Sequence, residues 1–166
     1  MTTIYQWSFA VKLFSALGCG LVAGIFFAFS TFVMKALAQL QPAQGITAMQ
    51  SINITVINPW FFVAFFGTAL TCLLLTISSL LKWHQPGAVF LLIGSLLYLF
   101  GTVLVTIAFN VPLNDALAIA KSNSPESAGL WARYLTNWTV WNHVRTIAAL
   151  AAATLLTIAL CNQTVK

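Results

Sequence analysis

The sequence predicts an all-α integral membrane protein, a four-helix bundle that forms a single transmembrane domain over residues 1–166. Hydrophobic residues make up 60% of the 166 residues and charged residues only 5%, whereas an average soluble domain carries about 25% charged residues. Four apolar runs follow one another along the chain, each near the ~20 residues that cross a hydrocarbon core of roughly 30 Å. A water-soluble monomer is therefore not expected.

The first two spans are expected at approximately 11–34 and 59–81. No charged residue lies between Lys12 and Lys35, and this run is longer than the ~7–15 residues of a secretory signal core. The second span begins at Pro59, and a first-turn position suits proline because an N–H there has no partner within the helix. Both runs are long enough to span a bilayer.

The third and fourth spans are expected at approximately 88–110 and 141–161. Pro112 ends or kinks the third helix, because the proline ring clashes with the preceding turn. The fourth apolar run is short. Trp138, Trp141 and Arg145 extend it at its start, as aromatic rings and a long cation at the level of the lipid headgroups.

Two connections are patterned as helices. A short amphipathic helix is predicted between the first and second spans, because apolar residues recur there at steps of three and four. Between the third and fourth spans, residues 112–121 form a helical connection. Ser124, Pro125 and Glu126 then supply an N-cap, a first-turn proline and an acid at the start of the next helix. That helix can run unbroken into the fourth span, since no further proline follows.

The distribution of charged residues bears on nucleic-acid binding and on which side of the membrane the termini lie. The net charge is +5, but the cations are scattered singly, so no nucleic-acid surface is expected. Four spans place both termini on one side, and the absence of acids there favours cytoplasmic termini. A stripe of small residues on the first span predicts close helix packing, within the chain or in a homo-oligomer. Its members are Ala16, Gly20, Gly24 and Ala28.

Polar residues form a stripe along the third span, at Tyr98, Thr102, Thr106, Asn110 and Asn114. Their four-residue step keeps them on one slowly drifting face. Buried amides need partners, so the stripe makes either interhelical hydrogen bonds or a polar pocket that faces the bundle.

The fourth helix carries the other candidates. Residues 131, 135, 138, 142 and 145 share one face, with two indoles, an amide and a guanidinium. His143 lies about 100° around the helix from Asn142. Histidine is the side chain best suited to exchange protons near neutral pH, so His143 is the candidate general base. An interfacial hydrogen bond or headgroup contact is its alternative role.

Three more polar residues, Gln50, Asn53 and Asn58, join a substrate site only if the amphipathic helix folds back over the mouth of the bundle. Otherwise they serve as caps and loop hydrogen-bond partners. No cofactor is expected: Asp115, Glu126 and one histidine are a poor ligand supply for a metal, and His84 and His143, expected on opposite membrane faces, cannot jointly ligate a haem iron. No phosphate loop or dinucleotide-binding fingerprint is present.

Several short stretches together give a family resemblance: residues 29–34 (FSTFVM), 45–53 (GITAMQSIN), 58–59 (NP), 110–114 (NVPLN) and 138–145 (WTVWNHVR). With them the chain resembles the small membrane proteins of the anthrone oxygenase family over nearly its whole length. The resemblance implies four spans and a bacterial plasma-membrane protein. It also implies kinship with fungal proteins that oxidise polyketide anthrones to anthraquinones with O2 and no evident metal or flavin.

Two functions follow as hypotheses. In the first, a cofactor-independent oxygenase takes a flat, hydrophobic aromatic molecule from the lipid bilayer and oxidises it with O2. His143 would be the base and Arg145 would stabilise the developing anion. Asn110, Asn114 and Asn142 would orient oxygens, and Trp138 and Trp141 would provide stacking walls. In the second, the chain is a non-enzymatic scaffold, accessory subunit, or binding or permeation protein.

Overall fold

The computed structural model describes residues 2–162, and all regular structure in that range is helical. The segments labelled η are π-helical, with one extra residue per hydrogen-bonded turn. In chain order the elements are α1 (Thr2–Ala28), η1 (Phe29–Val33), α2 (Met34–Ala38), α3 (Pro42–Thr55), α4 (Pro59–Phe62), η2 (Val63–Gly67), α5 (Thr68–Leu81), α6 (Ala88–Leu96), η3 (Leu97–Leu104), η4 (Thr106–Asn110), α7 (Val111–Ala118) and α8 (Ser127–Cys161).

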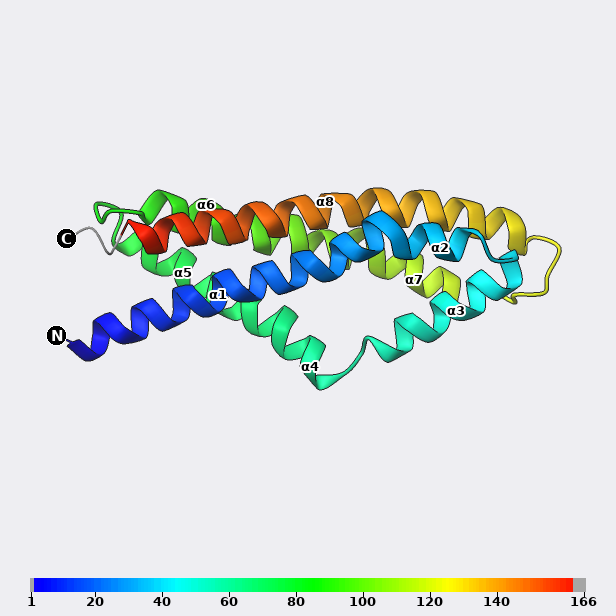
Figure 1. Ribbon diagram of the computed structural model, residues 1–166, viewed down its shortest axis with the longest axis horizontal. Helices are drawn as coiled ribbons and strands as arrows, with labels where there is room; N and C mark the ends of the chain where they lie inside the picture. Colours follow the sequence, from blue (N-terminus) through cyan, green and yellow to red (C-terminus); the bar gives the residue numbers. More distant parts are fainter. Residues whose placement is uncertain (1, 163–166) are drawn as a thin grey trace.

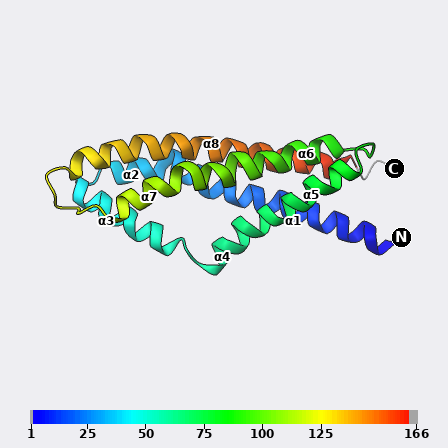
Figure 2. The same cartoon turned by 180° about the vertical axis from the view of Figure 1, so that it is seen from behind.

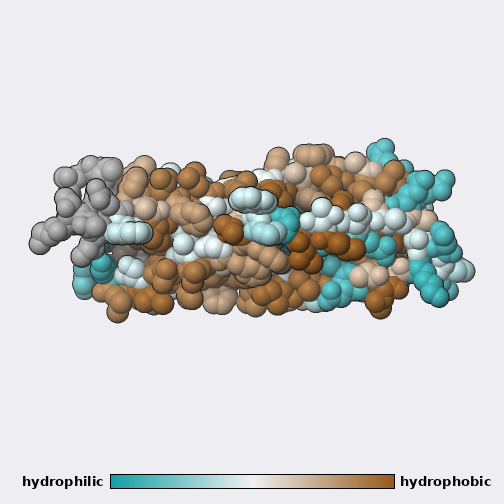
Figure 3. Space-filling view, turned by 90° about the horizontal axis from the view of Figure 1, so that it is seen from below, coloured by the Kyte–Doolittle hydropathy of each residue, from teal (hydrophilic) through white to brown (hydrophobic). Residues whose placement is uncertain are grey.

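Four continuous helices are long and apolar enough to cross a membrane: Trp7–Ala38, Pro59–Leu81, Ala88–Ala118 and Ser127–Cys161. The start of α1 and the end of α8 lie at the same end of the elongated bundle (Figure 1). Hydrophobic residues cover most of its length, and hydrophilic ones gather at the end that carries α3 and the α7–α8 connection (Figure 3). The predicted all-α membrane bundle is confirmed.

The long helix α8 forms the centre of the bundle and packs on α1, α6, η3, α3 and α7. Its buried residues recur every three or four positions, so they form one face. Alanines at 149 and 152 let α1 and α6 approach, while Ile147 and Leu150 on the outer face are exposed. Helix α8 runs from one end of the molecule to the other (Figure 1), so its buried face lines the bundle along its whole length.

The predicted helix between the first two spans is observed as α3. It packs on α2, α7 and α8 and buries Ile46 and Met49 there. Beyond it, α4 makes its main contacts only with the segment that follows it. The α3–α4 connection stands away from α8 when the bundle is viewed from either side (Figures 1 and 2).

The third helix does not end at Pro112 but continues through α7 to Ala118. The π-helical segment η4 ends just before the proline. A wider turn there accommodates the absent N–H and the ring of Pro112. The predicted long fourth helix is also present, but it begins at Ser127, after a turn in which the Ser127 N–H donates to the Ser124 carbonyl at 3.1 Å.

Close helix packing depends on glycines outside the predicted small-residue stripe. Gly20 and Gly24 face open space, whereas Gly94 lies against the Ala152 backbone and Gly101 against Ala148. Within the described part of the chain the two glycines of the stripe therefore make no close approach, although Ala16 is buried in the core. A homo-oligomer that uses it stays a prediction.

Replacement of Gly101 by alanine is expected to destabilise the bundle by about 1–3 kcal/mol, as other overpacked core positions do. The new Cβ would lie 2.5 Å from the Ala148 Cβ, so α8 must shift away. Thermal unfolding in detergent measures the effect. The matched variant Gly24→Ala meets no neighbour and should be neutral or stabilising by up to about 1 kcal/mol, because alanine favours the helix. Equal losses in both variants would contradict this packing.

Candidate functional site

A buried arginine lies near the middle of α8. Arg145 is only 4% exposed. Its guanidinium donates to Asn142 Oδ1 at 2.7 Å and to Thr106 Oγ1 at 3.2 Å. Its carbon Cζ lies 4.1 Å from the ring centre of Phe26 and 5.0 Å from that of Trp138. Two aromatic faces and two neutral oxygens thus surround the cation.

The chain contains only two acids, Asp115 and Glu126, and both are exposed and lie outside this cluster. Among residues 2–162 no carboxylate interacts with the Arg145 guanidinium, whose hydrogen bonds go to neutral oxygens. A buried cation without a counter-ion is costly, so such a residue within a membrane span is by default a candidate functional group. An anionic ligand would supply the missing charge.

Asn142 joins Arg145 to the first span. Its Nδ2 donates to the Phe26 carbonyl and to Ser30 Oγ, both at 2.7 Å. Ser30 also shares a hydrogen bond of 3.1 Å with Thr146, one turn further along α8. Because Ser30 lies in η1 and Thr106 in η4, π-helical segments of two spans supply partners to the same site.

Two buried polar atoms in this region have no hydrogen-bond partner, Nε of Arg145 and Oδ1 of Asn110. The other end of the Asn110 amide donates to the Trp138 carbonyl at 3.2 Å. An unpaired donor and an unpaired acceptor are each costly when buried. Together they suit a ligand that presents an anionic oxygen and a hydroxyl group.

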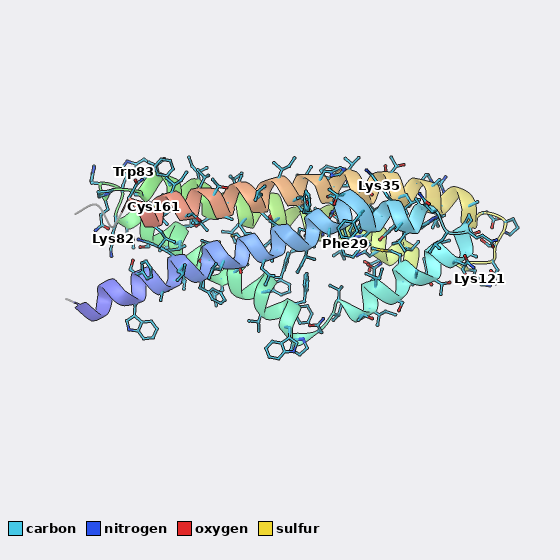
Figure 4. All side chains as sticks on the ribbon, in the orientation of Figure 1. Phe29, Lys35, Lys82, Trp83, Lys121 and Cys161 are labelled. Carbon is cyan, nitrogen blue, oxygen red and sulfur yellow. The ribbon has the colours of Figure 1, made fainter. Side chains whose placement is uncertain are left out.

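An aromatic ladder extends from this cluster toward the α7–α8 end. Trp131, Tyr134 and Trp138 stack in sequence, with ring centres 5.6 and 6.2 Å apart. Asn114 accepts from the Tyr134 hydroxyl and from Trp138 Nε1, both at 2.8 Å, and the Asn53 side chain also approaches that hydroxyl. Phe29 of η1 packs on Trp138, with ring centres 5.7 Å apart, and lies near the middle of the molecule (Figure 4).

Five of the predicted residues thus form one continuous cluster: Asn110, Asn114, Trp138, Asn142 and Arg145. Asn53 lies at its edge, beside Tyr134.

Three other predicted residues make contacts outside this cluster. Gln50 donates to the carbonyls of Leu117 and Ala120 at the end of α7, at 2.8 and 3.2 Å. Asn58 is the N-cap of α4 and accepts from the Phe61 N–H at 3.0 Å. Trp141 stacks on Phe109, with ring centres 3.6 Å apart, and so ties α8 to η4. The contacts of Gln50 and Asn58 match their alternative role as hydrogen-bond partners of the backbone.

His143 lies apart from this cluster. Its side chain is exposed, whereas Asn142 and Arg145 on the same helix are buried. The 100° step between adjacent helical residues separates them. The role of general base stays a prediction for His143, and this geometry does not support it for a molecule held by Arg145.

Sequence reasoning missed three residues that contact the predicted ones, Phe26, Ser30 and Tyr134. Phe26 is one of many apolar residues in its span, so no pattern singles it out. Ser30 belongs to the 29–34 stretch that carries the family resemblance, and this was the available signal. Within residues 2–162, no three histidine, cysteine or acidic side chains gather as a possible metal site.

The comparison with protein families gives one match. A family model described as Anthrone oxygenase matches residues 60–155, more than half of the chain. The matched range includes Asn110, Asn142 and Arg145. No curated protein and no solved structure matches the chain.

Proposed function

The chain belongs to the anthrone oxygenase family, and on this premise we propose that it oxidises an anthrone-like or electron-rich phenolic molecule with O2. The observation that carries the proposal is the buried, counter-ion-free guanidinium of Arg145 between the rings of Phe26 and Trp138. A flat aromatic substrate that becomes an anion during the reaction matches both the charge and the aromatic walls.

The proposed role of Arg145 is to stabilise the substrate anion. Removal of a proton from the activated CH2 group of an anthrone gives an enolate, whose charge lies mainly on oxygen. A guanidinium already fixed by Asn142 and Thr106 needs little rearrangement to bind that oxygen. In a site shielded from water the attraction is far stronger than in bulk solvent.

The overall reaction balances without an added reductant. The CH2 group becomes C=O by losing four electrons, and O2 accepts those four electrons. One oxygen atom enters the product, and the other leaves as water with the two hydrogens of the CH2 group. The anion supplies the first electron to O2, a carbon–oxygen bond forms as a peroxide, and loss of water from the peroxide gives the ketone.

The first experiment follows conversion of a simple anthrone to its quinone by protein purified in detergent under air. Protein-free and heat-treated samples are the controls, because anthrones also oxidise spontaneously. Acceleration that requires O2, consumes one O2 per anthrone and places isotopically labelled oxygen in the new carbonyl supports the oxygenase. A folded protein with no acceleration above the controls contradicts it.

His143→Ala tests the general base in the same assay. Because the His143 side chain is exposed and does not face Arg145, we expect the variant to keep most of its activity, within about threefold of wild type. A positioned general base contributes about 10²–10⁴-fold, so a loss of that size in a folded variant would restore His143 as the base. It would also place the substrate on the outer face of α8.

A second candidate function is supported by the completeness of the Asn142 hydrogen bonds. Both ends of this amide bind groups of the protein itself. Such a network also suits a non-catalytic scaffold or binding protein, in which Arg145 only holds helices in register. In that case, loss of Arg145 would lower stability instead of activity.

A further inference from the structure

A narrow crevice lies at the end of the bundle where α1 starts and α8 ends. It opens between α1, the end of α5 and the turn that leads into α6. Its polar lining consists of Ser8, Lys12, Ser78, Ser79, Lys82 and Gln85. Since Lys82 directly follows the second span and Ala88 begins the third, the crevice lies at the level where spans meet the headgroup layer.

Lys12 is the most unusual residue of this crevice. It is only 5% exposed, and the structure gives it no hydrogen bond or ion pair with any described side chain. Lys82 lines the same crevice and is close enough for the two positive charges to interact. Two like charges facing one crevice repel each other, and an anion between them would convert that repulsion into attraction.

Other features of the crevice also favour an anion. Helix α6 begins at Ala88 in its wall, and the start of a helix carries partial positive charge. The Ser78 hydroxyl and the Gln85 amide can donate further hydrogen bonds. Both acids of the chain lie elsewhere, Asp115 in α7 and Glu126 just before α8, toward the opposite end of the bundle (Figure 1).

We propose that this crevice binds a phosphate group, that of an anionic phospholipid in the leaflet on the side of the termini. Lysine ammonium groups bind phosphate as point charges on flexible stems, so Lys12 and Lys82 can close on it from two helices. Basic residues next to membrane spans attract anionic headgroups in the same way. The site is independent of the Arg145 cluster.

Thermal unfolding in detergent tests the proposal, with phosphatidylglycerol or phosphatidylcholine added at equal concentration. A ligand that binds only the folded protein raises Tm, so phosphatidylglycerol should raise Tm more than phosphatidylcholine does. The variants Lys12→Gln and Lys82→Gln should each lose about half or more of that difference, because each removes one of the two cations. Lys35→Gln and Lys121→Gln change lysines outside the crevice (Figure 4) and should keep the difference.

Two further measurements address a folding failure and the source of the phosphate group. If Lys12→Gln does not fold, two other variants still test the site. Lys82→Gln changes an exposed residue and should reduce the difference in Tm between the two lipids, whereas the conservative Lys12→Arg should keep it. Inorganic phosphate at fixed ionic strength distinguishes the source: a shift as large as that of phosphatidylglycerol, lost in Lys82→Gln, identifies free phosphate and overturns the lipid assignment. Equal effects of both lipids, or an unchanged difference in Lys82→Gln, overturn the site itself.

Discussion

Replacement of Arg145 by methionine is expected to lower the rate of anthrone oxidation by about a hundredfold or more, the usual cost of losing a group that stabilises a developing oxyanion. The fold is expected to survive. Among the residues that the structure describes, Arg145 has no carboxylate partner, so its removal leaves no opposite charge stranded in the bundle. Arg145→Lys keeps the charge but loses the planar fork that contacts both Asn142 and Thr106, so its activity should be intermediate.

The matched control is Arg133→Met, which removes an exposed arginine from the same helix. Its oxidation rate and Tm should stay near those of wild type. Unaltered oxidation in a folded Arg145→Met variant would exclude the proposed anion stabilisation. A large fall in Tm, with the remaining folded protein fully active, would support the scaffold function instead.

Replacement of Asn142 by alanine is expected to lower the free energy of unfolding by about 2–3 kcal/mol, because buried groups lose their partners. The variant removes the donor to Phe26 and Ser30 and the acceptor for Arg145. Without Asn142 Oδ1, one buried N–H of the charged Arg145 guanidinium has no hydrogen bond. Unfolding in detergent by heat or denaturant measures the change.

Asn137→Ala is the control for this prediction, since Asn137 is an exposed amide on the same helix. A surface change of this kind stays within about 0.5 kcal/mol. Equal stability of the two variants would mean that the Asn142 hydrogen bonds do not hold α8 against α1. Asn142→Asp adds a second test, because a carboxylate beside Arg145 would neutralise the guanidinium and abolish its use for a substrate anion.

The fold was accessible from the sequence because membrane spanning depends on local properties. Twenty apolar residues and the breaks between them predict a span wherever they stand, and the four helices occur near those positions. Helix α3 was predicted in the same way from its apolar periodicity. The sequence left open whether Pro112 ends or kinks the third helix; in the structure the helix continues to Ala118, and a π-helical segment ends just before the proline.

The candidate site was only partly accessible. Helical periodicity alone places Asn142 and Arg145 on one face of α8 and separates His143 from them. The contribution of the first span was not visible, since Phe26 and Ser30 act through contacts with residues more than a hundred positions away. Gln50 and Asn58 were included as possible site residues. Asn58 instead caps α4, and Gln50 in α3 binds two carbonyls at the end of α7, a contact between distant segments that no local pattern predicts.

The sequence by itself determined that this protein is a four-span helical bundle, because hydrophobicity and helical period are local and regular. It also placed Arg145 and Asn142 in the fourth span and Asn110 and Asn114 in the third. Tertiary structure alone decided which polar groups meet. It placed Phe26, Ser30 and Thr106 around Arg145 and kept both acids away from it. It also left Gly20 and Gly24 facing outward and brought Lys12 next to Lys82. These outcomes depend on the rotation and depth of each helix in the bundle, which no single helix specifies.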